Sequence, residues 1–95
     1  MVRVVAQFFF QEGKADEALV LIKELVAETK KEAGCISYDA FTDMGDKNHV
    51  FIIECWESQE VLDIHSNSKH FTTLVPQIAA FSAKPPVIEK IELVV

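Results

Sequence analysis

Residues 50–57 read VFIIECWE, and this stretch decides the fold class. Its β-branched and aromatic composition predicts a strand. Successive side chains of a strand point to opposite faces. One face therefore carries Phe51, Ile53 and Cys55, and the other carries Val50, Ile52, Glu54 and Trp56. Both faces are largely apolar, so we expect the sheet that contains this strand to be covered on both sides.

The segments around this strand predict the remaining elements. A polar hairpin loop at residues 43–48 connects it to an earlier strand at residues 35–42. Before that strand, residues 14–33 show helical periodicity, with Gly34 as the C-terminal cap. Residues 2–11 form a first strand. After residue 57, Ser58 and Ser68 each begin a short helix, and the consecutive prolines at 85–86 precede a last strand at residues 87–95.

The resulting order is β-α-β-β-α-β, which predicts a ferredoxin-like sandwich of the α+β class. We expect one antiparallel sheet with the helices on one face. The chain contains no repeat, linker or low-complexity tract, so residues 1–95 are predicted to form a single domain.

The hydrophobic content predicts a homodimer. Of the 95 residues, 49% are hydrophobic and seven are Phe, which is more apolar material than one small core needs. A second subunit stacked sheet to sheet would cover the face that the helices leave bare.

Charge and cysteine usage exclude several classes of function. The net charge is −6, and the only adjacent basic pair is Lys30-Lys31, so we expect no nucleic-acid binding. No apolar run approaches the ~20 residues of a membrane span, and no signal peptide is evident. Cys35 and Cys55 form no CxxC pair, and we expect reduced thiols in a cytoplasmic protein.

Four short motifs resemble those of the antibiotic biosynthesis monooxygenase family, the dimeric α/β barrel monooxygenases. They are Gly34-Cys35-Ile36-Ser37-Tyr38, Glu54-Cys55-Trp56-Glu57-Ser58, His65, and Ser68-Lys69-His70-Phe71. The resemblance covers nearly the whole chain in element order. It implies a dimeric barrel in which each subunit holds a small molecule in an apolar pocket. The family includes quinol and polyketide monooxygenases, haem-degrading enzymes and an autoinducer-processing protein.

Two residues are the candidate catalytic groups. His65 lies on the apolar side of a short helix, where a histidine is either a structural residue or, at a pocket edge, a base with a pKa near neutrality. Tyr38 is either a half-buried strand aromatic or a hydrogen-bond donor to a substrate oxygen.

Four residues are candidate substrate-binding groups. The resemblance implies that Trp56 forms a pocket wall; otherwise it plugs the end of the sandwich. Glu54 shares that face, either in an inter-strand or inter-subunit ion pair, for example with Arg3 or a lysine, or as a pocket acid with a raised pKa. Ile52 lies on the same face, and Gln7 is an isolated polar group on the first strand.

The sequence carries no flavin, haem, metal or phosphate-loop signature, so we expect no cofactor. His65 and His70 are five positions apart and would not share a face of one helix, which argues against a metal site. The position that ligates haem iron in haem-degrading members falls at or next to Val75.

These points favour a cofactor-independent monooxygenase that acts on a small phenolic or quinol-like substrate and molecular oxygen. In the alternatives, the protein is an isomerase for a small oxygenated metabolite, of the autoinducer-processing type, or a dimer that binds hydrophobic molecules without converting them.

Overall fold

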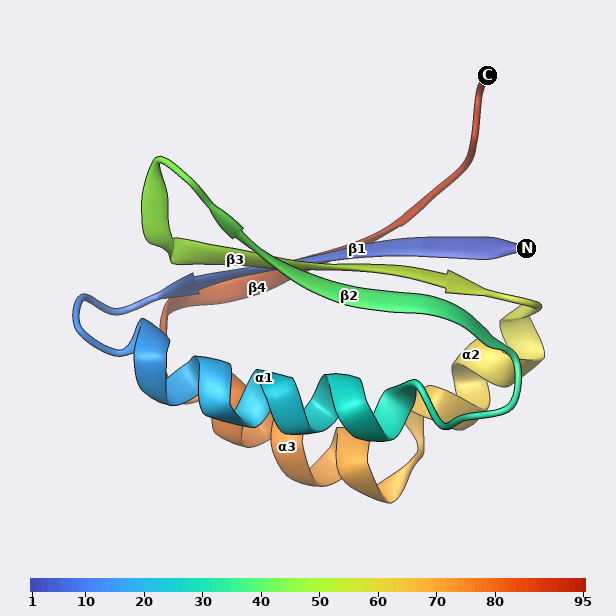
Figure 1. Ribbon diagram of the computed structural model, residues 1–95, viewed down its shortest axis with the longest axis horizontal. Coiled ribbons are helices and arrows are strands. Elements are labelled where there is room, and N and C mark those ends of the chain that lie inside the picture. Colours follow the sequence, from blue (N-terminus) through green and yellow to red (C-terminus); the bar gives the residue numbers. More distant parts are fainter.

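Four strands form one antiparallel sheet, and three helices lie on one of its faces (Figure 1). The computed structural model describes residues 1–95. The elements in chain order are β1 Val2–Phe10, α1 Ala15–Thr29, β2 Cys35–Asp43, β3 Asp46–Trp56, α2 Gln59–Ser66, α3 Lys69–Ala79 and β4 Ser82–Ile91. The strands lie in the order β2-β3-β1-β4 across the sheet. The predicted ferredoxin-like fold is confirmed, with its second helical region divided between α2 and α3.

The alternation of β1 and β3 places one set of side chains beneath the helices. The buried residues of this face are Val4, Ala6, Phe8 and Phe10 of β1, and Val50, Ile52, Glu54 and Trp56 of β3, while Cys55 of β3 is buried on the opposite face. Val4 pairs with Glu54, and Ala6 pairs with Ile52, so the two sets share one face of the sheet. The division of faces predicted for residues 50–57 is therefore confirmed.

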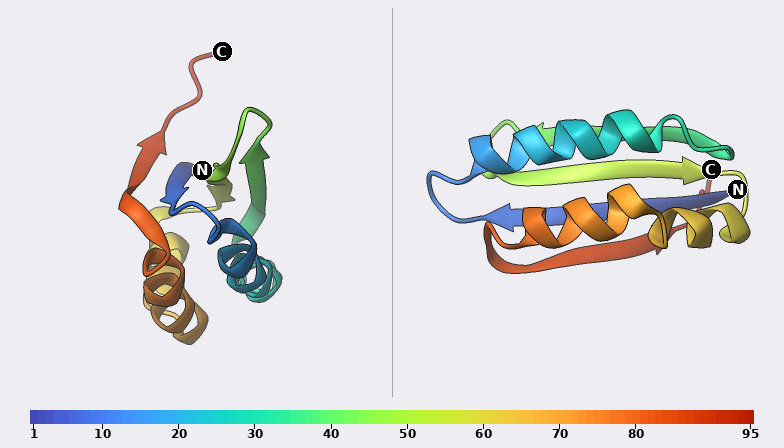
Figure 2. Two further views of the ribbon diagram at one scale, coloured as in Figure 1. Left: turned by 90° about the vertical axis from the view of Figure 1, so that its left-hand side faces the viewer. Right: turned by 90° about the horizontal axis from the view of Figure 1, so that it is seen from below.

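Helices α1 and α3 cover this face, each with an apolar stripe. Figure 2 shows them side by side in one layer against the sheet. Ile22 and Leu25 of α1 and Ile78 of α3 are almost completely buried. Full burial of a side chain of this size stabilises a fold by about 1.5–3 kcal/mol. The core is therefore centred between these two helices and the two middle strands.

Ser58 and Ser68 begin α2 and α3, as predicted. The hydroxyl oxygen of Ser58 accepts a hydrogen bond from the backbone N–H of Val61 at 3.3 Å. That of Ser68 accepts one from the N–H of Phe71, also at 3.3 Å. Each bond satisfies an N–H group that the first helical turn leaves free. Asn67 stands between the two helices and separates them.

The first helix is shorter than the predicted 14–33. It ends at Thr29, and the chain then tightens, with the N–H of Glu32 bonded to the carbonyl of Thr29 at 3.0 Å. Gly34 is therefore not a helix cap but the last residue before β2, with a left-handed φ of +88°. A Cβ there would lie 2.7 Å from Val61 of α2, so only glycine fits at this point, where the chain before β2 passes close to α2.

The last strand begins earlier and ends earlier than predicted, at Ser82 and Ile91 rather than 87 and 95. It includes Pro85 and Pro86, which lack an N–H donor. This is tolerated because β4 is an edge strand, and because its pairing with β1 is irregular between Gln7 and Phe9. Residues 92–95 extend away from the sheet on the side opposite to the helices (Figure 1).

The hairpin between β2 and β3 is tighter than the predicted loop at 43–48. Only Met44 and Gly45 separate the strands, and an Asp43 carboxylate oxygen accepts from the N–H of Gly45 at 2.7 Å. This turn extends β3 backwards, so that His49 lies within the strand rather than at a loop edge.

The face of the sheet opposite to the helices is apolar and uncovered in the single chain. Phe41 is 47% exposed, Ile53 42% and Ile91 46%. Phe51 lies between Phe41 and Gln7 in the pairing of the three strands and contributes to the same face.

No helix of the chain has both the length and the apolar character needed to cross a bilayer.

Candidate active site

A cavity of about 360 Å³ lies between the helix-covered face of the sheet and helices α2 and α3. Ten of its 16 lining residues are hydrophobic. At its polar edge the ammonium of Lys90 donates to the side-chain oxygen of Gln59 at 2.8 Å, joining β4 to α2. This volume and mostly apolar lining suit one small organic molecule.

His65 is the most deeply placed basic group of the cavity. It is 1% exposed, and its Nδ1 lies 2.6 Å from Oε2 of Glu32. A carboxylate can only accept, so Nδ1 carries the hydrogen and Nε2 keeps a lone pair. Nε2 is buried and has no hydrogen-bond partner. Burial lowers the pKa of His65, although the hydrogen bond that it donates to Glu32 opposes this effect, and the lowered pKa favours the neutral ring.

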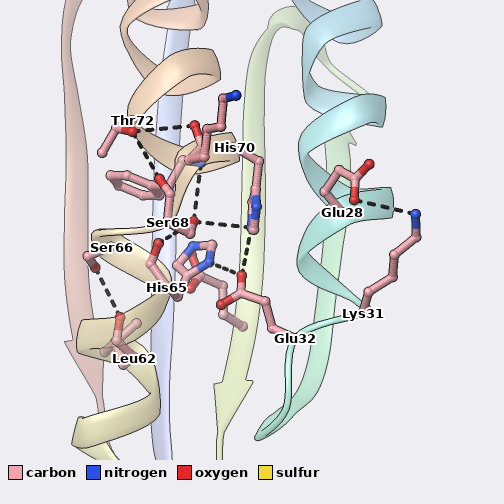
Figure 3. Close-up of polar contacts among 12 residues, drawn as sticks. Glu28, Lys31, Glu32, Leu62, His65, Ser66, Ser68, His70 and Thr72 are labelled. Carbon is pink, nitrogen blue, oxygen red and sulfur yellow. Dashed lines mark hydrogen bonds and ion pairs between the residues drawn. The ribbon is translucent and has the colours of Figure 1, made fainter.

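His70 meets His65 at the same carboxylate oxygen. Its Nε2 lies 2.8 Å from Oε2 of Glu32 and 3.2 Å from the hydroxyl of Ser68. Figure 3 shows the two imidazoles converging on Glu32 from α2 and α3. The expectation that His65 and His70 lie apart is therefore wrong. That expectation rested on their five-residue spacing along a helix, whereas the two histidines lie on separate helices, and both rings reach the Glu32 carboxylate.

Glu32 is the functional residue that the sequence reasoning missed. In the sequence it directly follows Lys30 and Lys31, and such a run of charged residues is typical of a solvent-exposed helix end. Because α1 stops at Thr29, the turn instead carries Glu32 inward, and its side chain is only 14% exposed. No periodicity in the sequence signals that early end. Glu32, His65 and His70 each offer a ligand atom, and these atoms lie within 4.8 Å of one another.

Tyr38 and Trp56 pack around His65. The Tyr38 ring is edge-on to His65, with centroids 5.4 Å apart, and Tyr38 lines the cavity. Burial raises the pKa of Tyr38, and the nearby Glu54 raises it further, so its phenol stays neutral. Trp56 lies 4.6 Å from His65 between ring centroids but is completely buried and does not line the cavity. Trp56 therefore packs against His65 without lining the cavity.

Glu54 lines the cavity from the middle of the sheet and is 6% exposed. Its Oε1 accepts from the indole N–H of Trp56 at 2.9 Å. Within the chain, Glu54 forms no ion pair, because neither Arg3 nor a lysine lies within salt-bridge distance of it. Burial raises the pKa of Glu54 to about 7, although the indole hydrogen bond lowers it.

The two other sequence candidates lie on opposite faces of the sheet. Ile52 lines the cavity, as its position beside Glu54 predicts. Gln7 lies on the uncovered face, where its side-chain oxygen is 2.9 Å from Nε2 of His49. Within one chain, Gln7 therefore does not meet the other candidates. Val75 also lines the cavity and offers no atom that could ligate iron.

Comparison with known proteins identifies relatives along most of the chain. The sequence profile of the antibiotic biosynthesis monooxygenase family matches residues 1–77. A solved structure described as an antibiotic biosynthesis monooxygenase is 38% identical, covers 99% of both chains and has a TM-score of 0.95. A conserved protein from Methanosarcina mazei Go1 is 31% identical over 95% of this chain and 89% of its own, with a TM-score of 0.92.

An uncharacterized protein from a Synechocystis strain is 29% identical over 76 residues, which are 80% of this chain and 52% of that protein. The YjcS protein of Bacillus subtilis is 34% identical over 55 residues, which are 58% of this chain and again 52% of the relative. The chain thus spans about half the length of these two relatives.

Proposed function

This chain belongs to the antibiotic biosynthesis monooxygenase family, and from that premise we propose that it is a cofactor-independent monooxygenase. Its substrate is a small phenolic or quinol-like molecule bound in the cavity beside His65. One observation carries the proposal: His65 lines the cavity, and its buried Nε2 has no hydrogen-bond partner within the chain.

In the proposed reaction, Nε2 of His65 takes the proton of the substrate hydroxyl. The electron-rich phenolate then reacts with molecular oxygen at a ring carbon. That carbon keeps one oxygen atom. Its hydrogen and the proton held by His65 both go to the second oxygen atom, which leaves as water, and His65 becomes neutral again. A phenol and O₂ thus give a quinone and water, and the substrate supplies all the electrons, so no external reductant is needed.

The surroundings of His65 support this role. As Nε2 takes up the proton, the imidazolium is stabilised by the Glu32 carboxylate at Nδ1. The apolar walls, among them Phe8, Leu25 and Phe71, exclude water and hold an aromatic ring. The neutral phenol of Tyr38 can donate a hydrogen bond to a substrate oxygen.

We extend the proposal to the oligomeric state: the working form is a homodimer joined through the uncovered sheet faces. The exposed apolar side chains of that face support a second copy as its cover. Gln7 and His49 lie on this face and would then be buried at the interface rather than in the substrate cavity.

Glu54 favours isomerisation as the second candidate function. A carboxyl with a pKa of about 7 and a neutral imidazole line the same cavity. Such an acid and base can move a proton between two substrate atoms without oxygen. In that case Glu54 donates a proton and His65 accepts one.

Oxygen uptake with a panel of naphthols and naphthohydroquinones tests these functions, using ¹⁸O₂ to label the product. We expect uptake above the enzyme-free rate, with one labelled oxygen atom in the product. His65→Gln should lower the rate by about 10²–10⁴-fold, the usual contribution of general acid–base catalysis. Glu60→Gln, an exposed change on α2, is the control and should have no effect.

The contrary results are specific. Substrate conversion under argon, without oxygen uptake, would favour the isomerase. Tight binding of these aromatics without conversion of any of them would favour a non-catalytic binding protein.

A further inference from the structure

Three metal-ligating atoms converge at one edge of the cavity. They come from three different segments: Glu32 from the turn after α1, His65 from α2 and His70 from α3 (Figure 3). Both ring nitrogens approach the same carboxylate oxygen, at 2.6 Å for His65 and 2.8 Å for His70. Two imidazoles and one carboxylate are a donor set that divalent transition metals prefer.

The charge of Glu32 has no permanent counterion. The two lysines next to it in sequence bind elsewhere: Lys30 pairs with Asp39 at 3.1 Å, and Lys31 pairs with Glu28 at 3.4 Å. The only groups within salt-bridge distance of Glu32 are the two histidines, which are uncharged unless protonated. A carboxylate with a side chain only 14% exposed is thus left largely desolvated and without a fixed positive partner.

A cation has a route to this carboxylate from solvent. The His70 side chain is 21% exposed, whereas that of His65 is 1% exposed. His70 also lines a shallow surface groove between α1 and α3, together with Glu24, Glu28 and Lys69. Because Lys31 pairs with Glu28 and Lys69 lines the same groove, the groove is a solvent route to the cluster and not a strongly negative one.

We propose that Glu32, His65 and His70 form a binding site for one divalent transition-metal ion of the Zn²⁺ or Co²⁺ class. The ligand atoms are Oε2 of Glu32, Nδ1 of His65 and Nε2 of His70. Water completes the coordination shell on the side that His70 leaves open to solvent.

Binding requires the three ligand atoms, which lie within 4.8 Å of one another, to adjust their separations. Ligands about 2.0–2.1 Å from zinc in a tetrahedral shell lie about 3.4 Å from one another. Each nitrogen must therefore move away from Oε2 by less than 1 Å relative to its hydrogen-bonded position. His70 lies in the first turn of α3, and its partial exposure leaves room for this movement.

The bound ion would prevent His65 from acting as the catalytic base. This consequence rests on the proposed function. When Nδ1 of His65 binds the metal, it can no longer carry its hydrogen. The ring proton then resides on Nε2, and no proton is released if the ring was neutral. Nε2 changes from a lone-pair acceptor to a donor and cannot deprotonate the substrate. The site is therefore inhibitory.

Titration of the chelator-treated full chain with Co²⁺, followed by its visible absorbance, tests the binding, and Zn²⁺ is then used to displace Co²⁺. We expect one ion per chain. Glu32→Gln and His70→Gln should each weaken binding at least as much as the about 10–100-fold loss typical of outer-shell partners, because each changes a direct ligand. His49→Gln removes the one histidine outside the cluster and should bind like the unmodified chain.

Several results would overturn the proposal: no binding at equimolar Co²⁺ or Zn²⁺, binding unaffected by His70→Gln in a variant with an unchanged circular dichroism spectrum, or binding lost in His49→Gln. No substrate is present in these titrations. Their failure is therefore separate from failure of the monooxygenase proposal, which would appear as absent oxygen uptake in the metal-free protein.

Discussion

The carboxylate of Glu32 fixes the protonation pattern of His65. Because it accepts from Nδ1 at 2.6 Å, the lone pair is held on Nε2, the nitrogen that has no other partner. The identity of residue 32 therefore decides whether His65 can act as a base. In the same cavity, burial raises the pKa of Glu54 to about 7 and raises that of Tyr38, so Tyr38 stays neutral while Glu54 titrates near pH 7.

We predict that Glu32→Gln lowers kcat about 10–100-fold with little change in KM. The amide lacks the charge that stabilises the imidazolium, and its NH₂ group can donate to Nδ1 and so favour the wrong tautomer. Steady-state oxygen uptake measures both constants, with Glu60→Gln as the matched control on the surface. An unchanged kcat in Glu32→Gln would show that Glu32 does not position His65.

Glu54 should make the protein less stable as the pH rises. Its pKa is about 7 in the fold, compared with an ordinary value of 4.5. The stabilisation from burying the neutral acid is fully present below pH 4.5 and is lost as the pH rises to about 7. The loss is at most about 3 kcal/mol.

The test compares urea unfolding at pH 5 and pH 7.5 for the unmodified chain and Glu54→Gln. The amide does not titrate, so the variant should lose less stability between these two pH values. Equal losses would mean that Glu54 ionises normally within the fold.

Among the elements, the crossing of the turn before β2 with α2 determines the site. Gly34 lies against Val61 and has a φ of +88°, which together allow the turn to pass close beneath α2. This crossing brings Glu32 to His65. The early end of α1 and the break at Asn67 are the two local features that assemble the cluster.

Gly34→Ala and Gly13→Ala form a matched pair, because both glycines have a positive φ, +88° and +79°. At Gly13 nothing lies within 4 Å of an added Cβ, so alanine should cost only the conformational penalty of about 1–2 kcal/mol. At Gly34 the overlap with Val61 should add about 1–3 kcal/mol. Urea unfolding gives both values. Equal losses for the two variants would contradict the close packing of the turn on α2.

Element types and their order follow from the hydrophobic periodicity of the sequence. The strand prediction for β3 and the prediction of the two serine caps are both confirmed. The residues at which the elements begin and end are predicted less accurately. The edge position of β4 permits Pro85 and Pro86 within a strand, and only the tertiary arrangement shows that β4 is at the edge.

The cluster was missed for the same kind of reason. Glu32 and His70 enter the site through a turn and a helix break, whose geometry has no periodic signal in the sequence. His65, Tyr38, Glu54 and Ile52 lie on regular elements, and alternation or helical position places them on the buried side.

For the whole molecule, the asymmetry of the sheet is the decisive property. The helices cover one face of the sheet (Figure 2). That face borders the cavity, while the other face exposes Phe41, Ile53 and Ile91. A stable interface of more than about 1,000 Å² would remove this apolar surface from water. The proposed dimer therefore uses the face that does not carry His65.

Ile53→Lys should convert the dimer into a monomer of 10.7 kDa, because Ile53 lies on the uncovered face and is 42% exposed in the single chain. Ile64→Lys is the matched control, since Ile64 is 60% exposed on α2 and lies away from that face. Sedimentation equilibrium at micromolar concentration gives the mass. The same dimeric mass for both variants would place the interface elsewhere.

The central claim is that His65 presents a free, unprotonated Nε2 to the ligand in the cavity. Nitrogen-15 NMR of the imidazole rings in metal-free protein tests it most directly, recorded with and without a phenol that resists oxidation. We predict a hydrogen on Nδ1 and none on Nε2, and an Nε2 resonance that shifts when the phenol donates its proton or a hydrogen bond. A hydrogen on Nε2 in the free protein, or an Nε2 signal unchanged at saturating phenol, would contradict the claim.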